Sequence, residues 1–168
     1  MATKDELRNE LQRLRNTGFA AKLEQQATAK GFSASFLFGI ASRETNCVNE
    51  LGDVQDGKAH GVGIIQIDIQ HPIARQARDN GTWKTNPDPL IEFGAQILAQ
   101  NIQKARKELP TFTAQEQLKV AASGYNCGID RAISGAQDGD SDEHTTGHNY
   151  GRDVIARMAI FDELIAEG

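Results

Sequence analysis

The sequence of 168 residues lacks any long apolar run, and no stretch approaches the roughly 18–20 apolar residues that a membrane-spanning helix needs. Its opening stretch, MATKDELRNELQ, has no apolar core of the kind that marks a signal peptide. We therefore expect no membrane insertion. Three locations stay open: the cytoplasm, a mature form whose leader has been removed, or export by another route.

Basic residues are not in excess. The chain has 18 lysines and arginines against 23 aspartates and glutamates, which gives a net charge of −5. Nucleic acids and anionic membrane surfaces are usually bound by a basic face. The acidic balance argues against both partners, and it would not steer the chain toward an anionic polymer.

Cysteine is also scarce. Cys47 and Cys127 are too few for a disulfide scaffold and are not spaced as metal ligands. Two interpretations stay open: two buried thiols, or one disulfide that would stabilise the fold by roughly 2–4 kcal/mol. We expect no metal site and no other cofactor.

What is present is an ordinary globular composition, with 39% hydrophobic and 24% charged residues. The length suits one domain with one core. We find no internal repeat, linker or low-complexity segment, so we expect a single domain over residues 1–168.

Helix signals dominate the chain. Capping boxes begin at Thr3 and Thr113, Ser33 can cap a helix, and Asp88 stands before a proline suited to a first helical turn. Apolar residues at helical spacing follow each signal. The predicted helices run from the cap at residue 3 to a break at 16–18, then over about 19–30, 33–46, 89–109, 113–123, a short helix ending near 134, and 149–166.

One β element is predicted. Residues 49–63 hold four glycines and several acids and indicate a loop, whereas GIIQIDIQ (63–70) alternates apolar and polar residues like a short strand. Residues 71–87 look irregular, and GYNCG (124–128) interrupts two helices. The predicted class is α+β and mainly α.

Glu44 is the first candidate for chemistry. Leu37, Ile40, Ala41 and Glu44 share one face of a predicted helix, so a carboxylate stands on an apolar stripe. Desolvation raises the pKa of a carboxyl group, and a carboxyl that stays protonated suits a general acid. The alternative is a structural glutamate that reaches solvent or pairs with Arg43 or a remote arginine.

Further carboxylates follow Glu44. Asp53 and Asp56 lie in the predicted loop, and Asp68 lies on the polar face of the predicted strand. A protonated acid facing a second carboxylate is the arrangement used in glycoside hydrolysis. The sequence therefore favours a glycosidase cleft.

Four ordered motifs, GIASRET, GD…HGVGIIQID, SGYNCG and TTGHNYGRDVIARMAIF, resemble goose-type lysozymes and the related lytic transglycosylases of glycoside hydrolase family 23. The resemblance extends from about Phe32 to Phe161. It implies a lysozyme-like domain in which a helical core and a small sheet flank a substrate groove, with residues 1–31 as helices packed on it. It also implies cleavage of peptidoglycan at the β-1,4 bond between N-acetylmuramic acid and N-acetylglucosamine.

The resemblance also implies roles for individual residues. Glu44 falls on the catalytic acid and Asp68 on a carboxylate that positions water. The family's further aspartate falls on Asp53, but the loop is longer than the family pattern, so Asp56 is a second candidate. The implied groove residues are Gln66, Tyr125, Asn126 and Tyr150, with His60 and His71 near the same motifs.

Three functions stay open at this point. The first is inverting hydrolysis, the second is a lytic transglycosylase that uses Glu44 alone, and the third is a non-catalytic module that binds peptidoglycan. We expect a monomer acting on the bacterial cell wall as a bacteriolytic, antimicrobial enzyme, secreted or delivered by a phage.

Two smaller features have mainly structural interpretations. Asp138, Asp140 and Asp142 alternate as in some calcium loops, but the rest of the EF-hand pattern is missing, which favours a solvated acidic turn. Trp83 fits a sugar-stacking residue and a core contact equally well.

Overall fold

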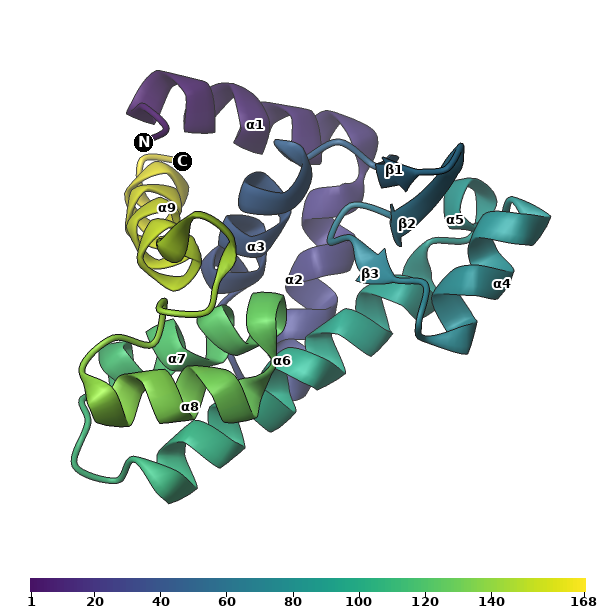
Figure 1. Cartoon of the computed structure of the whole chain (residues 1–168). Coiled ribbons are helices and arrows are strands. Elements are labelled where there is room, and N and C mark those ends of the chain that lie inside the picture. Colours follow the sequence, from purple (N-terminus) through teal and green to yellow (C-terminus); the bar gives the residue numbers. More distant parts are fainter.

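Helix α3 (Ala34–Thr45) lies at the centre of the computed structural model, which describes all 168 residues (Figure 1). The N-terminal helix α1 and the C-terminal helix α9 pack beside it, so the two ends of the chain lie close together. The other helices and the sheet complete the fold. Their bounds are α1 Lys4–Thr17, α2 Phe19–Lys30, α4 Pro72–Asn80, α5 Thr82–Thr85, α6 Asp88–Glu108, α7 Ala114–Cys127, α8 Ile129–Asp138, the short 3₁₀ helix η1 Thr146–His148, α9 Tyr150–Ala166, and the strands β1 Leu51–Gln55, β2 Lys58–Val62 and β3 Ile67–Asp68.

The larger of two apolar clusters joins most of the helices to the sheet, and a smaller cluster packs α8 against α6 and α7. Leu7, Leu14 and Leu23 from the first two helices are fully buried in the same cluster as residues of α3, α6 and α9. Phe38 and Phe161 meet edge to face with their ring centroids 5.8 Å apart. Because α3 is apolar nearly all round, it can be enclosed by other elements.

The helix starts predicted at Thr3, Ser33 and Thr113 are confirmed. The cap predicted at Asp88 is wrong, because Asp88 is the first residue of α6 and Pro87, at the N-cap position, makes no side-chain capping bond. Thr3 and Thr113 form complete capping boxes, and Ser33 accepts a hydrogen bond from the backbone N–H of Phe36. These caps satisfy backbone donors that have no partner inside a helix. The mainly α class with a small sheet is confirmed as well.

The prediction of a loop over residues 49–63 is wrong. These residues form an antiparallel hairpin, β1–β2, whose turn has positive φ at Asp56 (50°) and Gly57 (74°). Gly52 and Gly61 face each other in this hairpin, and a Cβ on either would lie 2.3 or 2.1 Å from Oε1 of Gln66. The glycines thus make room for a side chain instead of marking a loop.

The strand predicted over residues 63–70 is mostly wrong. Only Ile67–Asp68 pairs with β2, because Gly63 (φ 87°) and Gln66 (φ 50°) turn the backbone. Ile64, Ile65 and Ile67 are all buried, which strict alternation would not allow. The turn, not the pleat, directs these side chains inward.

Three further predictions need correction. Residues 71–87 are not irregular but contain α4 and α5, and α7 continues through GYNC to Cys127. The acidic segment is not a solvated turn at Asp142, whose side chain is fully buried.

No helix in the structure combines the length and the apolarity that crossing a membrane would require.

Candidate active site

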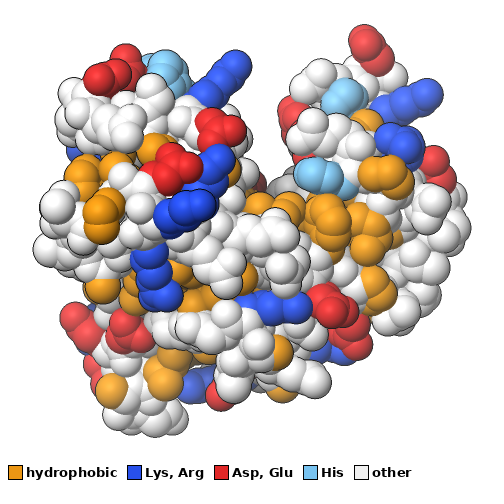
Figure 2. Space-filling model, turned by 90° about the horizontal axis from the view of Figure 1, so that it is seen from below, with side chains coloured by type: hydrophobic (Ala, Val, Ile, Leu, Met, Phe, Trp, Pro, Cys, Tyr) orange, Lys and Arg blue, Asp and Glu red, His pale blue; other side chains and the backbone are white.

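A cleft of about 610 Å³ separates the sheet from the C-terminal end of α7 and the start of α8. Figure 2 shows it as a notch between two lobes of the surface. Side chains from both lobes and from α3 line it. The predicted site residues found there are Glu44, Asp53, His60, Gln66, Asp68, His71, Tyr125 and Asn126.

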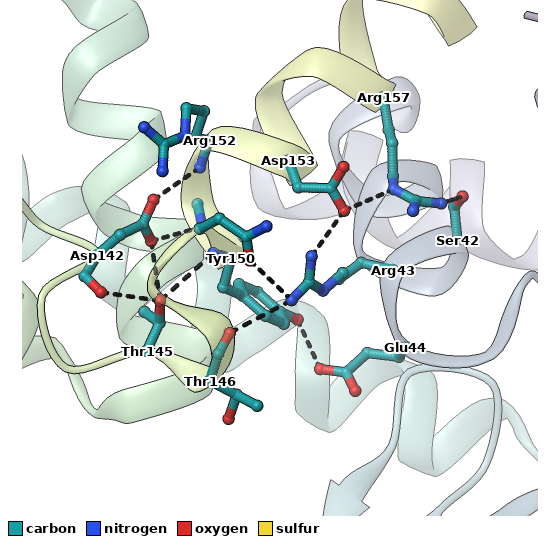
Figure 3. A network of polar contacts seen from close by, with 12 residues as sticks. Ser42, Arg43, Glu44, Asp142, Thr145, Thr146, Tyr150, Arg152, Asp153 and Arg157 are labelled. Atoms are coloured by element: carbon teal, nitrogen blue, oxygen red, sulfur yellow. Dashed lines mark hydrogen bonds and ion pairs between the residues drawn. The ribbon is translucent and has the colours of Figure 1, made fainter. Parts of the chain in front are cut away.

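Glu44 reaches the cleft from the last turn of α3. Its Oε1 accepts a hydrogen bond from the hydroxyl of Tyr150 at 2.5 Å (Figure 3). Burial raises the pKa of the Glu44 carboxyl, and this effect outweighs the Tyr150 hydrogen bond and the charge of Arg43, both of which lower it. The carboxyl is therefore biased toward its protonated form.

Arg43 does not form the pair with Glu44 that the alternative, structural interpretation of Glu44 allowed. Its Nη1 donates to Asp153 at 2.9 Å, and its Nη2 donates to Asn149 at 3.1 Å. The guanidinium also lies 5.3 Å from the centre of the Tyr150 ring. Arg43 thus holds the segment around Tyr150 and leaves Glu44 without a salt bridge.

Two tyrosines surround the Glu44 carboxyl. Tyr150 is the first residue of α9, and Tyr125 on α7 donates its hydroxyl to the carbonyl of Ile65 at 2.6 Å. Burial, followed by the charge of Glu44, raises the pKa of both phenols. Both therefore remain hydrogen-bond donors near neutral pH.

The candidate aspartates separate into two groups. Asp53 on β1 and Asp68 on β3 are exposed residues that line the cleft. Asp68 accepts the backbone N–H of Gln70 at 2.7 Å, and Asp53 accepts from the amide of Gln55. Asp56 lies in the hairpin turn and is not among the cleft residues.

Several predicted groove residues have structural contacts of their own. Gln66 donates to the carbonyls of Glu50 and Gly63, so its amide closes the turn before β3. Asn126 accepts the backbone N–H of Thr146 at 2.9 Å. His71 packs edge-on against Phe93 with ring centroids 4.9 Å apart, and His60 is half-buried on the sheet.

The two cysteines are free thiols, so the disulfide considered from the sequence is absent. Cys47 is buried with its sulfur 3.6 Å from Glu10 on α1. Cys127 is half-buried and lines the cleft. The two thiols belong to different surroundings, one in the core and one at the site.

Asn101 is a cleft residue that the sequence reasoning missed. It is 6% exposed, lines the cleft, and donates its amide to the carbonyl of Ala121 at 3.2 Å. Its signal was available: Asn101 follows Ile97 by one helical turn on the inner face of α6, so a polar residue stands on an apolar stripe, as with Glu44.

A mainly helical domain whose small sheet forms one wall of a carboxylate-lined cleft defines a lysozyme-like fold. The family model described as Lysozyme g matches residues 6–164. The chain belongs to the lysozyme g family, which confirms the resemblance seen in the four motifs.

Individual relatives agree with this assignment. Lysozyme g of Gallus gallus is 30% identical over 127 residues, covering 76% of this chain and 56% of the relative. Lysozyme g of Takifugu rubripes is 32% identical over 122 residues, covering 72% and 62%. Lysozyme g of Epinephelus coioides is 28% identical over 145 residues, covering 83% and 72%. The chain thus spans less than two thirds of the length of the first two.

Proposed function

We propose that this chain is a muramidase that hydrolyses the β-1,4 bond between N-acetylmuramic acid and N-acetylglucosamine in peptidoglycan. Glu44 acts as the general acid and protonates the glycosidic oxygen. Asp68, assisted by Asp53, positions and activates the attacking water on the opposite face of the sugar, which inverts the configuration at the reacting carbon.

The position of Glu44 carries this proposal. A half-buried carboxyl with a raised pKa opens into the cleft and has no salt-bridge partner. Such a carboxyl holds its proton closer to neutral pH than an exposed glutamate does, which general acid catalysis requires. A structural glutamate would be expected to pair with a cation instead.

The second carboxylate follows from which aspartates share the cleft with Glu44. Asp53 and Asp68 line it, whereas Asp56 does not. An inverting enzyme places its acid and base about 6.5–9.5 Å apart to leave room for water. The proposed site therefore contains Asp68 and Asp53 but not Asp56.

The lining of the cleft fits a neutral sugar. No lysine or arginine lines it, and its polar groups are amides, tyrosine, histidines and carboxylates. These groups can exchange hydrogen bonds with ring hydroxyls and acetamido groups. The proposed substrate is the glycan of the bacterial cell wall, reached by secretion or phage delivery, and the proposed active form is a monomer.

Digestion of purified peptidoglycan by the wild type and by Glu44→Gln tests the proposal. The wild type should release fragments whose masses include one added water per cleavage, and Glu44→Gln should lose at least about 10²-fold in rate. Products with 1,6-anhydro ends would instead identify a lytic transglycosylase. Failure of the wild type to clear a wall suspension would indicate a binding module.

Three matched variants test the second carboxylate. Asp68→Asn and Asp53→Asn should each slow hydrolysis, whereas Asp56→Asn, at the turn of the same hairpin, should leave the rate unchanged. All three remove one exposed charge from the sheet region, so folding effects are matched. Equal rates in all three would remove the aspartates from the mechanism.

A further inference from the structure

We propose that Asp142 is a positioning residue of this site: it fixes the start of α9 against α7 and thereby holds the Tyr150 hydroxyl on Glu44. Asp142 does not line the cleft and touches neither Glu44 nor the Tyr150 hydroxyl. Its effect on catalysis rests on the proposed function, whereas its effect on the carboxyl of Glu44 does not.

Asp142 is fully buried and fully engaged by donors. Its Oδ1 accepts from Ser123 Oγ at 2.9 Å and from the backbone N–H of Gly151 at 2.7 Å, and its Oδ2 accepts from the backbone N–H of Arg152 at 3.0 Å (Figure 3). Thr145 Oγ1 adds a contact at 3.3 Å. A buried carboxylate is retained only with such compensation, so this arrangement specifies one geometry.

The contacts with the backbone N–H groups of Gly151 and Arg152 cap α9. Asn149 stands at the N-cap position but makes no side-chain capping bond. Asp142 reaches from the preceding loop to the free N–H groups of Gly151 and Arg152 instead. Its negative charge at a helix N-terminus is also favoured by the helix dipole.

The contact with Ser123 ties the same helix start to α7. Ser123 immediately precedes the cleft-lining Gly124, Tyr125 and Asn126. The helices approach so closely that a Cβ on Gly151 would lie 2.2 Å from Ser123 Oγ and 2.6 Å from the carbonyl oxygen of Lys119. One carboxylate thus joins the start of α9 to the helix that forms the far wall of the cleft.

Tyr150 lies one residue before Gly151 and follows its placement. Its backbone N–H donates to Thr145 Oγ1 at 3.3 Å, and Thr145 is itself a partner of Asp142. From the other side, Arg43 packs over the ring. Loss of Asp142 would release the start of α9 while the burial of Glu44 by α3 remains.

The charge state of Glu44 reports this release. The groups that face Glu44 are Tyr150 from α9, Tyr125 from α7 and Arg43 from its own helix, and the cleft adds Asp53, His60, Asp68 and His71. The Tyr150 hydrogen bond stabilises the ionised carboxyl, so its loss should raise the pKa of Glu44 further.

Titration of the Glu44 carboxyl carbon by NMR in the full chain tests the proposal. We expect Tyr150→Phe and Asp142→Ala each to raise the pKa of Glu44. The double variant should match Tyr150→Phe, because both changes remove the same contact, the hydrogen bond from Tyr150 to Glu44. Asp142→Asn, which keeps one acceptor oxygen, should lie between wild type and Asp142→Ala.

Thr113→Ala is the matched control. It removes a side-chain cap from α7 itself, at the end far from the cleft, and should lower stability while leaving the pKa of Glu44 unchanged. If Asp142→Ala and Asp142→Asn leave this pKa at the wild-type value while Tyr150→Phe changes it, Asp142 is structural only. Additive changes in the double variant would also overturn the proposal.

The same variants separate this proposal from the proposed function. The titration needs no substrate, so it decides the role of Asp142 even if the wild type fails to lyse cell walls. Where lysis occurs, kcat should fall by equal factors in Asp142→Ala, Tyr150→Phe and the double variant, with KM little changed. If the two losses of kcat multiply in the double variant, Asp142 does not act through Tyr150.

Discussion

The hydroxyl of Tyr150 donates a 2.5 Å hydrogen bond to Oε1 of Glu44, joining the first residue of α9 to the last turn of α3. Burial and this bond act on the carboxyl in opposite directions, and burial is the stronger. Glu44 is thus biased toward the acid form but kept able to ionise. A general acid that must give up its proton and recover it needs both properties.

The stability of the protein should depend on the charge of Glu44. The folded-state pKa of this carboxyl lies above its unfolded value, so the folded chain retains a proton that the unfolded chain releases. Stability therefore falls as the pH rises from the unfolded pKa through the folded one. Glu44→Gln should be more stable than wild type at pH 7, and the gain should vanish in acid.

Chemical unfolding of both proteins at several pH values measures this gain. Glu44→Gln is also the variant expected to be inactive, so stability and activity should change in opposite directions. Gln117→Glu is not a suitable control, because the amide of Gln117 donates a hydrogen bond to a backbone carbonyl and an ionised glutamate could not donate it. A stability difference that is constant with pH would contradict the prediction.

The pH dependence of lysis should report the same group. Activity should decline as the pH rises through the pKa of Glu44, because the general acid is then deprotonated. Tyr150→Phe should move this decline to higher pH, since the lost hydrogen bond favoured the ionised form. Initial rates over a range of buffers at constant ionic strength measure it, and a move toward lower pH would contradict the assignment.

Asp153 should be one of the most sensitive structural residues. It is 8% exposed and accepts from Arg43 at 2.9 Å and from Arg157 at 2.8 Å. Burial by itself would raise its pKa, but the hydrogen bonds and the positive charges of the two arginines together outweigh burial and lower the pKa. Its stabilising effect is therefore present above the unfolded pKa and is lost as the pH falls through the folded one.

We expect Asp153→Asn to destabilise the fold by roughly 3–5 kcal/mol at pH 7, because it leaves two half-buried arginines without a charge partner. The loss should shrink in acid, where the wild-type carboxyl is protonated too. Asp162→Asn, an exposed change on the same helix, is the control. Urea unfolding at neutral and acid pH compares them, and equal stability of both variants would refute the prediction.

The thiols should react very differently. Burial, followed by the nearby Glu10, raises the pKa of Cys47 far above its usual range. Burial also raises the pKa of Cys127, but this thiol is only half-buried and opens to the cleft, where a reagent can reach it. A thiol reagent should modify one cysteine in the native chain and two after unfolding. Mass analysis should place the native adduct on Cys127, and an adduct on Cys47 in the native state would contradict the structure.

Modification of Cys127 should also slow lysis. The adduct would occupy volume in the cleft beside Asn126 and Gly128. Cys127→Ser should keep its activity and resist the reagent. Inhibition of Cys127→Ser by the same reagent would locate the effect elsewhere.

Local patterns were sufficient for much of the helical part. Side-chain caps act within one turn, so Thr3, Ser33 and Thr113 marked helix starts that the structure has. Helical spacing likewise exposed Glu44 as a carboxylate on an apolar face. Asn101 carries the same signal on α6, a polar residue one helical turn from Ile97 on the inner face.

The sheet was predicted poorly because its determinants are not local. Gly52 and Gly61 are glycines because the Gln66 side chain lies across the hairpin, and this contact forms only when the strands pair and the turn before β3 directs Gln66 onto them. The buried isoleucines after Gly63 lie in a turn, so alternation gave the wrong element. Propensity was overridden by packing in both cases.

Neighbouring residues were enough to predict the helical class, the family and Glu44 as the candidate acid, because caps, periodicity and motif order can be read along the chain. Three features emerge only in the folded chain: Asp53 and not Asp56 shares the cleft with Glu44, Arg43 pairs with Asp153, and Asp142 is buried. Each of these depends on segments that are distant in the chain, and desolvation and hydrogen bonding act between groups only once folding has brought them together.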